Sequence, residues 1–237
     1  MGWIAIIVGI TLLGILLYWL LVTTEGVFLG RRVVVWLYDL TAFRYDAIKE
    51  FSDDDDSFFI ARPTLRVLGS RHNPKILDVA TGTGRAMLAL LADPVFDGCV
   101  VGLDASKKML DQASDKLHEL EGRDKMFMLV QQYAASLPFP EDSFDAVCCL
   151  EALEFVPSYT DALREMIRVL KPGGPLITSR RRGSQAKLFL TRYRSKADFD
   201  GMLRTVGFED IQSRLWELDY DMVTARKPVV MKTAVTD

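Results

Sequence analysis

Two glycines and two aspartates mark the part of the sequence best suited to bind a small molecule. The stretch ILDVATGTGR, residues 76–85, places Asp78 just before a turn that contains Gly82 and Gly84. Glycine has no Cβ and adopts positive φ readily, so this turn lets a ligand approach the backbone. Asp104 ends the later stretch VVGLD, twenty residues after Gly84, where a carboxylate can accept both hydroxyls of a ribose. The pair predicts a site for a nucleoside-containing ligand.

Both features also have simpler interpretations, and two ligand classes remain open. A glycine turn can be purely structural, and Asp104 could cap the next helix, although Ser106 could do that instead. The ligand could be a nicotinamide dinucleotide or S-adenosylmethionine. Met87 stands where the dinucleotide fingerprint expects its third glycine. A carboxylate at Asp78 is unfavourable beside a pyrophosphate but suits an ammonium group, so S-adenosylmethionine is favoured.

Few residues are suited to acid–base chemistry. The chain has only two histidines, His72 and His118, and neither lies at the predicted site. The remaining candidates near the strand ends are two carboxylates and three phenols: Glu151, Glu154, Tyr38, Tyr45 and Tyr133. The sequence does not single out one of them as a catalytic base, so the catalytic residue stays unknown.

No metal site is predicted. The three cysteines, Cys99, Cys148 and Cys149, lack the spacing of zinc ligands and lie in apolar runs, which indicates buried, reduced thiols. The acidic run at residues 52–56 is more simply explained as a solvated turn or a helix start. A net charge of -3 gives no argument for a nucleic-acid partner.

The elements that must position the candidate residues alternate along the chain. Five short apolar strands are predicted at residues 75–79, 99–103, 126–130, 144–150 and 176–179. Helical patterns separate or follow them at residues 85–92, 106–121, 160–170 and 196–206. This alternation predicts an α/β fold, a parallel sheet with helices on both faces. The last two strands, residues 211–218 and 222–226, are joined by a short turn and must be antiparallel.

The N-terminus differs in character from this domain. Residues 3–22 contain no charged side chain, and a helix of about twenty apolar residues crosses a bilayer core. No basic residue precedes the run and no small-residue cleavage site follows it, which argues against a signal peptide. We therefore predict a transmembrane anchor at residues 1–24. Arg31, Arg32, Arg44 and Lys49 follow it, which places the domain on the cytoplasmic side as a single-pass membrane protein.

Two further segments bear on the partners. Residues 25–60 form an aromatic stretch in which Val35, Trp36, Tyr38, Leu40, Phe43, Ala47 and Ile48 could share one apolar helical face, packed on the domain or on the membrane. The segment 180–196 carries seven basic residues. It could attract an anionic membrane surface or be a solvated loop. The remaining domain spans residues 61–237.

The motifs together resemble a known family. ILDVATGTGR, VVGLDASKKML, AASLPFPEDSFDAV and REMIRVLKPGGPLI are similar to successive motifs of class I S-adenosylmethionine-dependent methyltransferases. The branch with the ubiquinone and menaquinone C-methyltransferases is the most similar, and the resemblance covers roughly residues 60–227. It implies a Rossmann-like, seven-stranded sheet with a C-terminal antiparallel hairpin and S-adenosylmethionine as cofactor.

The resemblance also implies a set of cofactor-binding residues: Asp78, Ala80, Thr81, Gly82, Gly84, Asp104, Ala105, Met109, Tyr133, Ala134 and Glu151. In such enzymes Asp78 and the glycine turn would hold the methionine part, and Asp104 the ribose. Ala105, Met109 and Ala134 would lie near the adenine, and Glu151 beneath the sulfonium. Two positions depart from the pattern. Tyr133 stands where an aspartate is usual, and Arg85 where the quinone branch often has an acidic residue.

The function that follows is a membrane-anchored methyltransferase. Tethering the domain to a bilayer favours a small lipophilic acceptor, such as a quinone precursor or another lipid. Two alternatives remain: a non-catalytic protein that keeps the fold, which Tyr133 would favour, and a nicotinamide-dependent oxidoreductase, against which the missing third glycine counts.

Overall fold

A seven-stranded sheet forms the centre of the protein. The computed structural model describes residues 2–49, 56–123 and 126–229. The strand order is β3-β2-β1-β4-β5-β7-β6; β1 to β5 are parallel, and β7 is antiparallel to both of its neighbours. The strands are β1 (Lys75–Val79), β2 (Cys99–Asp104), β3 (Phe127–Gln131), β4 (Ala146–Cys149), β5 (Pro175–Arg181), β6 (Glu209–Glu217) and β7 (Tyr220–Arg226). The predicted Rossmann-like sheet with an antiparallel C-terminal hairpin is confirmed.

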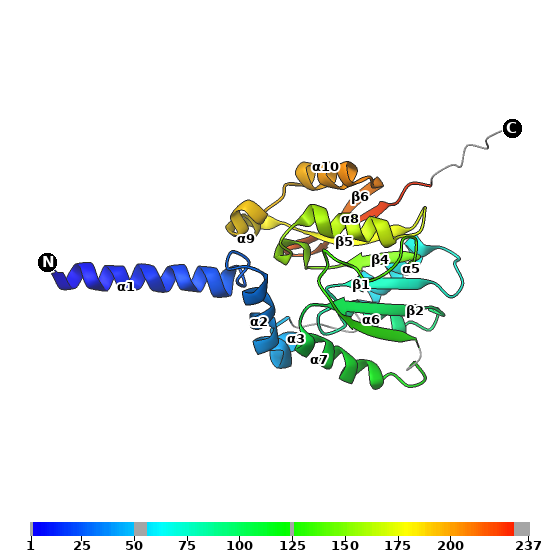
Figure 1. Cartoon of the computed structure of the whole chain (residues 1–237), viewed down its shortest axis with the longest axis horizontal. Coiled ribbons are helices and arrows are strands. Elements are labelled where there is room, and N and C mark those ends of the chain that lie inside the picture. Colours follow the sequence, from blue (N-terminus) through cyan, green and yellow to red (C-terminus); the bar gives the residue numbers. More distant parts are fainter. Residues whose placement is uncertain (1, 50–55, 124–125, 230–237) are drawn as a thin grey trace.

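Helices cover both faces of the sheet (Figure 1). The first face packs against α5 (Arg62–Leu68), α6 (Arg85–Ala92) and α7 (Lys107–His118). The second packs against α8 (Tyr159–Val169) and α10 (Lys196–Val206). Consecutive strand residues alternate between these cores, since side chains along a strand point to opposite faces. Ile76 joins the first core and Leu77 the second, and both are fully buried.

Besides the 3-10 turn Leu153–Phe155, three short helices were not predicted from the sequence. One is α5, where Pro63 lies in the first turn and Gly69 follows the last residue, both ordinary boundary signals. The others are α9 (Gly183–Ala186) and the 3-10 segment Lys187–Arg192, which lie where a basic loop was expected. Strand β4 is also shorter than predicted, because Phe144 pairs separately with Leu170 before the strand begins.

The apolar N-terminal run forms one helix that projects from the domain (Figure 1). It consists of α1 (Gly2–Tyr18) and a π-helical continuation, Trp19–Thr23. This helix is long and apolar enough to cross a membrane. Its most apolar 18-residue stretch has no residue buried against the other described residues. Thr24 ends it by bonding back to the carbonyl of Trp19.

Between this helix and the sheet, the chain folds into what we call the cover segment, residues 31–49. It contains α2 (Arg31–Thr41), a 3-10 turn (Ala42–Arg44) and α3 (Tyr45–Lys49), and it packs on α7. The apolar residues that were expected to share one helical face lie instead on two sides of this segment. Val35 and Tyr38 face the domain interior, whereas Trp36, Leu40 and Phe43 are more than half exposed. Ile48 is also exposed on α3.

Candidate active site

The glycine turn between β1 and α6 has the backbone geometry that a ligand cradle needs. Ala80, Gly82 and Gly84 all have positive φ, at 57°, 56° and 86°. A Cβ at Gly84 would lie 3.1 Å from the Ala113 Cβ, so this glycine lets α6 approach α7. A Cβ at Gly82 would meet no atom within 4 Å and would occupy cavity space instead. Ala80 holds a strained conformation for a residue with a side chain, a feature that tends to occur at binding sites.

Asp104 joins this turn to the end of β2. Its Oδ2 accepts the N–H of Gly82 at 2.9 Å, and its Oδ1 accepts the N–H of Ser106 at 2.8 Å. Ser106 is the residue that caps α7, since its Oγ accepts the N–H of Met109. Asp104 is therefore not needed as a helix cap. Each of its oxygens keeps a further lone pair, which suits a diol.

Asp78 lies below the turn with almost no solvent contact. Burial raises its pKa to about 7, although a hydrogen bond from the Thr81 hydroxyl opposes that rise. Burial also raises the pKa of Asp104, against the effect of its backbone hydrogen bonds. Two buried carboxylates in one cavity favour a ligand that brings a positive charge and hydroxyl donors. The residues present thus fit S-adenosylmethionine, which carries an ammonium, a sulfonium and a ribose.

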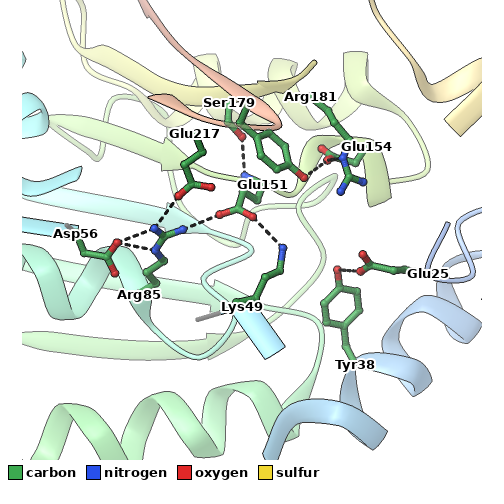
Figure 2. Close-up of polar contacts among 11 residues, drawn as sticks. Glu25, Tyr38, Lys49, Asp56, Arg85, Glu151, Glu154, Ser179, Arg181 and Glu217 are labelled. Carbon is green, nitrogen blue, oxygen red and sulfur yellow. Dashed lines mark hydrogen bonds and ion pairs between the residues drawn. The ribbon is translucent and has the colours of Figure 1, made fainter. Parts of the chain in front are cut away.

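Arg85 organises a cluster of charges beside the cavity (Figure 2). Its guanidinium contacts Asp56, Glu151 and Glu217, with nitrogen–oxygen distances of 2.6 to 2.8 Å. Lys49 of the cover segment contacts the other oxygen of Glu151 at 2.9 Å. Among these five side chains, three carboxylates face two cations, which leaves one excess negative charge. Such a surplus favours a cationic group nearby.

Glu151 owes its position to an unusual backbone conformation just after β4. Its φ is 50°, and its N–H donates to the Ser179 Oγ of β5 at 2.6 Å. The turn directs the Glu151 side chain into the cavity that Asp78 and Asp104 line. Glu154 follows three residues later but does not line this cavity; it is buried against Tyr220, whose hydroxyl donates to it.

The cover segment closes the opposite side of the cavity. Asp46 accepts a hydrogen bond from Thr83 of the glycine turn and pairs with Lys116 of α7 at 2.6 Å. Asp39 accepts a hydrogen bond from the Ser106 Oγ at 2.6 Å. The Arg31 guanidinium stacks on the ring of Tyr133 at 4.6 Å. With the Lys49–Glu151 pair, the segment thus contacts the loops that follow four different strands, β1 to β4.

The structure places most of the predicted binding residues around one cavity. Its lining includes Asp78, Ala80, Thr81, Gly82, Asp104, Ala105, Tyr133, Ala134 and Glu151. Two predicted residues do not line the cavity: Met109 is buried within α7, and Gly84 lies at the start of α6. Among the described residues, no group of three acidic, histidine or cysteine side chains could hold a metal ion.

Several residues of this site were not found from the sequence. Asp39, Asp46, Lys49 and Asp56 all contact it, and Asp56 is buried rather than part of a solvated acidic loop. Residues 52–55 of that acidic run lie outside the described residues. A usable signal existed in the cover segment, where Arg31, Val34, Val35 and Tyr38 recur at helical spacing and line the cavity.

Two of the phenols near the cavity, Tyr38 and Tyr45, are poor candidates for a base. Burial raises the pKa of Tyr38 well above its usual value, and the neighbouring Glu25, which accepts a hydrogen bond from the Tyr38 hydroxyl at 2.6 Å, raises it further. Burial likewise raises the pKa of Tyr45. These hydroxyls stay protonated at neutral pH, so they can donate hydrogen bonds but not remove a proton.

Comparisons with known proteins agree with this geometry. Residues 77–178 match a family described as a methyltransferase domain. Demethylmenaquinone methyltransferase of Bacillus mycoides (strain KBAB4) is 38% identical over 116 residues, which is 49% of this chain and 48% of that protein. The Staphylococcus aureus (strain MRSA252) enzyme of the same name is 35% identical over 134 residues, 56% of this chain and 54% of that protein. The chain spans about half the length of the curated relatives it matches.

Solved structures share the fold at lower identity. A SAM-dependent methyltransferase from Aquifex aeolicus superposes with a TM-score of 0.58 at 18% identity, over 74% of this chain and 98% of that one. The cyclase SpnF superposes with a TM-score of 0.60 at 24% identity, over 71% and 81%. At these identities the likeness shows the fold alone. The occurrence of a cyclase on it illustrates that the fold does not fix the reaction.

Proposed function

We propose that this protein is a membrane-anchored enzyme that methylates a small lipophilic acceptor. The premise is that the chain carries a class I S-adenosylmethionine-dependent methyltransferase domain of the quinone-methyltransferase branch, with S-adenosylmethionine as cofactor. A quinone precursor is the leading acceptor class and another membrane lipid the second. One observation carries the proposal: the cofactor cavity is closed by the cover segment, which follows directly on a helix of membrane-spanning length.

The proposed cofactor contacts follow from the cavity lining. Asp104 would accept the ribose hydroxyls, and Asp78 with the backbone of Ala80 and Gly82 would hold the amino-acid part. Ala105 and Ala134 would flank the adenine. Once bound, S-adenosylmethionine supplies a methyl group activated by a sulfonium. The excess negative charge around Glu151 would hold that cation in place, because opposite charges attract strongly in a partly dry cavity.

The acceptor side of the cavity is apolar. Val34, Val35, Tyr38, Phe155 and Val156 line it. This surface would exclude water and hold a hydrophobic ring, and the protein's contribution would be orientation of the acceptor. Tyr38 and Tyr45 stay protonated, and of the two candidate carboxylates, Glu151 and Glu154, only Glu151 lines the cavity. It would hold an acceptor hydroxyl or receive its proton.

Membrane attachment is part of the proposal. Trp36, Leu40 and Phe43 of the cover segment are exposed, and we propose that they meet the membrane surface beside the preceding apolar helix. Aromatic side chains suit the membrane interface. Arg31, Arg32 and Arg44 lie close to this surface in the sequence, and the positive-inside tendency then puts the domain in the cytoplasm.

The first test is cofactor binding by the full chain in detergent micelles, measured by titration calorimetry. We expect micromolar binding of S-adenosylmethionine, weakened at least tenfold by Asp104→Ala because the ribose contact is lost. Asp111→Ala, an exposed aspartate on α7, is the matched control and should bind as the parent does. Absence of binding by the folded parent protein would favour a non-catalytic relative.

The second test concerns the acceptor. The same protein, given cofactor labelled in the methyl group and a membrane extract, should place label in the lipid phase. Extraction with organic solvent and chromatography would identify the labelled compound. Label found only in protein or in water-soluble products would reject the acceptor class while leaving cofactor binding intact.

A further inference from the structure

A second cavity lies beside the first and has the opposite charge. Four arginines line it, and we call it the arginine pocket: Arg180, Arg181, Arg192 and Arg194. Glu154 is the only acidic residue in its described lining. The pocket lies at the end of β5 and beneath the 3-10 segment Lys187–Arg192. The basic segment predicted from the sequence is therefore folded partly inward, and it does not lie wholly on the surface.

Arg181 is the central group of this pocket. Its guanidinium lies 4.3 Å from the ring centre of Phe189 and 5.3 Å from that of Tyr220, with 19% of the side chain exposed. Its nearest carboxylate is Glu154, at 3.9 Å, too far for a good hydrogen bond. The buried Nε and Nη1 of Arg181 have no hydrogen-bond partner among the described residues.

Arg180 adds a second donor of the same kind. Its side chain is nine-tenths buried, and its terminal nitrogens bond to Asp221 and to backbone carbonyls. Its Nε lacks a partner within the described part of the chain. Leaving a charged donor buried and unsatisfied destabilises the folded state. The three nitrogens belong to two arginines that line one cavity, and a ligand with several acceptor oxygens would satisfy such donors.

The other two arginines carry charge that no carboxylate in the described structure neutralises. Arg192 donates to the carbonyls of Val156 and Pro157, and Arg194 donates to those of Thr191 and Tyr193. Neither forms an ion pair with a described residue. Asp221 pairs with Arg180, so Glu154 is the one carboxylate in the described lining that faces Arg181, Arg192 and Arg194. The pocket therefore keeps a net positive charge.

The pocket lies near the end of the N-terminal apolar helix. Phe155 contacts both Tyr38 of the cover segment and Phe189 of the pocket, with ring centres 5.9 Å apart in each case. Figure 2 shows Glu25, Tyr38, Glu154 and Arg181 in the same region. Burial alone lowers the pKa of Arg181, but Tyr220, Glu154 and Glu25 hold it above its usual value. Glu25 follows the last helical residue, Thr23, by two positions.

We propose that the arginine pocket binds a phosphate-type oxyanion, with Arg181 and Arg180 donating from inside and Arg192 and Arg194 closing the outer side. Arginine suits this role because its planar guanidinium presents several donors to tetrahedral oxyanions. The oxyanion could belong to a lipid headgroup at the membrane surface or to free phosphate. This site does not depend on methyl transfer and goes beyond the proposed function.

The test uses the full chain in micelles of an uncharged maltoside detergent at 0.15 M salt. Two probes are titrated by calorimetry: inorganic phosphate and dihexanoyl phosphatidic acid, a soluble lipid phosphate. We expect binding of at least one probe, weakened at least fivefold by Arg194→Gln and more strongly by Arg181→Gln. Binding of only the lipid probe identifies a headgroup, and binding of only the inorganic probe identifies free phosphate.

Matched variants keep the result decisive. Arg204→Gln removes an exposed arginine of the neighbouring α10, so it lowers the net charge equally without touching the pocket. If Arg204→Gln weakens binding as much as Arg194→Gln, or if neither probe binds, the proposal is wrong. Arg194→Gln remains informative if Arg181→Gln fails to fold. Cofactor binding by Arg194→Gln should be unchanged, which separates this proposal from the proposed function.

Discussion

The two cavities differ in charge although one short loop separates them. The cofactor cavity is lined by Asp78, Asp104 and Glu151, whereas the arginine pocket is lined by four cations. The dividing loop contributes Glu151 to the first and Glu154 to the second. From the sequence these two glutamates were equivalent candidates for catalysis. The positive φ of Glu151 turns its side chain to one side, while Glu154 is buried on the other.

This contrast suggests that each cavity is matched to a ligand charge. A surplus of carboxylates stabilises a cation, and a surplus of guanidinium groups stabilises an anion. Placing the two within one domain allows a cationic cofactor and an anionic group to bind side by side without competing. The comparison can be tested by removing charges from the acidic cavity and asking which ligands respond.

The largest expected effect comes from titrating Asp78. Its pKa of about 7 in the folded protein lies above the unfolded value of 3.8, so the carboxylate is protonated in much of the acidic range. The affinity for S-adenosylmethionine should fall about tenfold for each pH unit below 7, or about 100-fold at pH 5. Asp78→Asn should bind weakly, with little dependence on pH. Calorimetry across pH 5 to 8 measures both.

Adenosine is the control for this titration, because it has the ribose and base but no ammonium group. If adenosine loses affinity as steeply as S-adenosylmethionine, then Asp78 does not hold the amino-acid part. Protonation of Asp78 weakens cofactor binding, but it favours the folded state over the unfolded state. The folded state takes up the proton more readily, so the contribution of Asp78 to stability decreases as pH rises from about 4 to about 7.

A smaller effect is expected from Glu151→Gln. Loss of this carboxylate leaves Arg85 and Lys49 with less compensation beside the cavity. Binding of the cationic S-adenosylmethionine should weaken about tenfold, while its neutral-sulfur product should weaken less than about threefold. Glu217→Gln removes another partner of Arg85 that does not line the cavity, and it should change the two affinities equally. Equal losses for both ligands in Glu151→Gln would contradict a role for its charge.

The smallest expected effect concerns the cover segment, which contributes to the cofactor cavity but not to the described lining of the arginine pocket. Asp46→Asn weakens the link to Thr83 and Lys116, at a cost of about 1 kcal/mol. Deuterium exchange in residues 31–49 should become faster, and cofactor affinity should fall about fivefold. Asp111→Asn, an exposed ion-pair partner on the same α7, serves as control. Unchanged exchange would show that Asp46 does not secure the cover.

Local patterns in the sequence were enough for the sheet and for the cofactor loops. Strand β1 and helices α6 and α10 begin and end where the pattern predicted, because apolar periodicity and glycine stops mark those ends directly. Ser106 proved to be the cap of α7, which leaves Asp104 available for a ligand. Helix α5 was missed although Pro63 and Gly69 mark its ends, because its seven residues are too few to show a periodicity.

Other parts of the site could not be predicted because their contacts join distant residues. Three partners of Arg85 lie 29, 66 and 132 positions away from it, in three separate parts of the chain. The sequence marked Arg85 as unusual but could not say what it would contact. The sequence also could not say where the basic side chains of segment 180–196 would lie. A run of arginines reads the same in the sequence whether it is exposed or lines a pocket. Only packing against Phe189 and Tyr220 made Arg181 an interior group.

The sequence by itself determined the order of strands and helices, the glycine turn, the aspartate that ends β2 and the apolar N-terminal helix. These features depend on residue type and on spacing over a few positions, which fix φ, ψ and the side of an element that is buried. The tertiary structure alone decided that the cover segment closes the cofactor cavity, and that Glu151 and Glu154 serve different cavities. Those outcomes depend on how the layers stack, and the free energy of such contacts is shared among residues far apart in the chain.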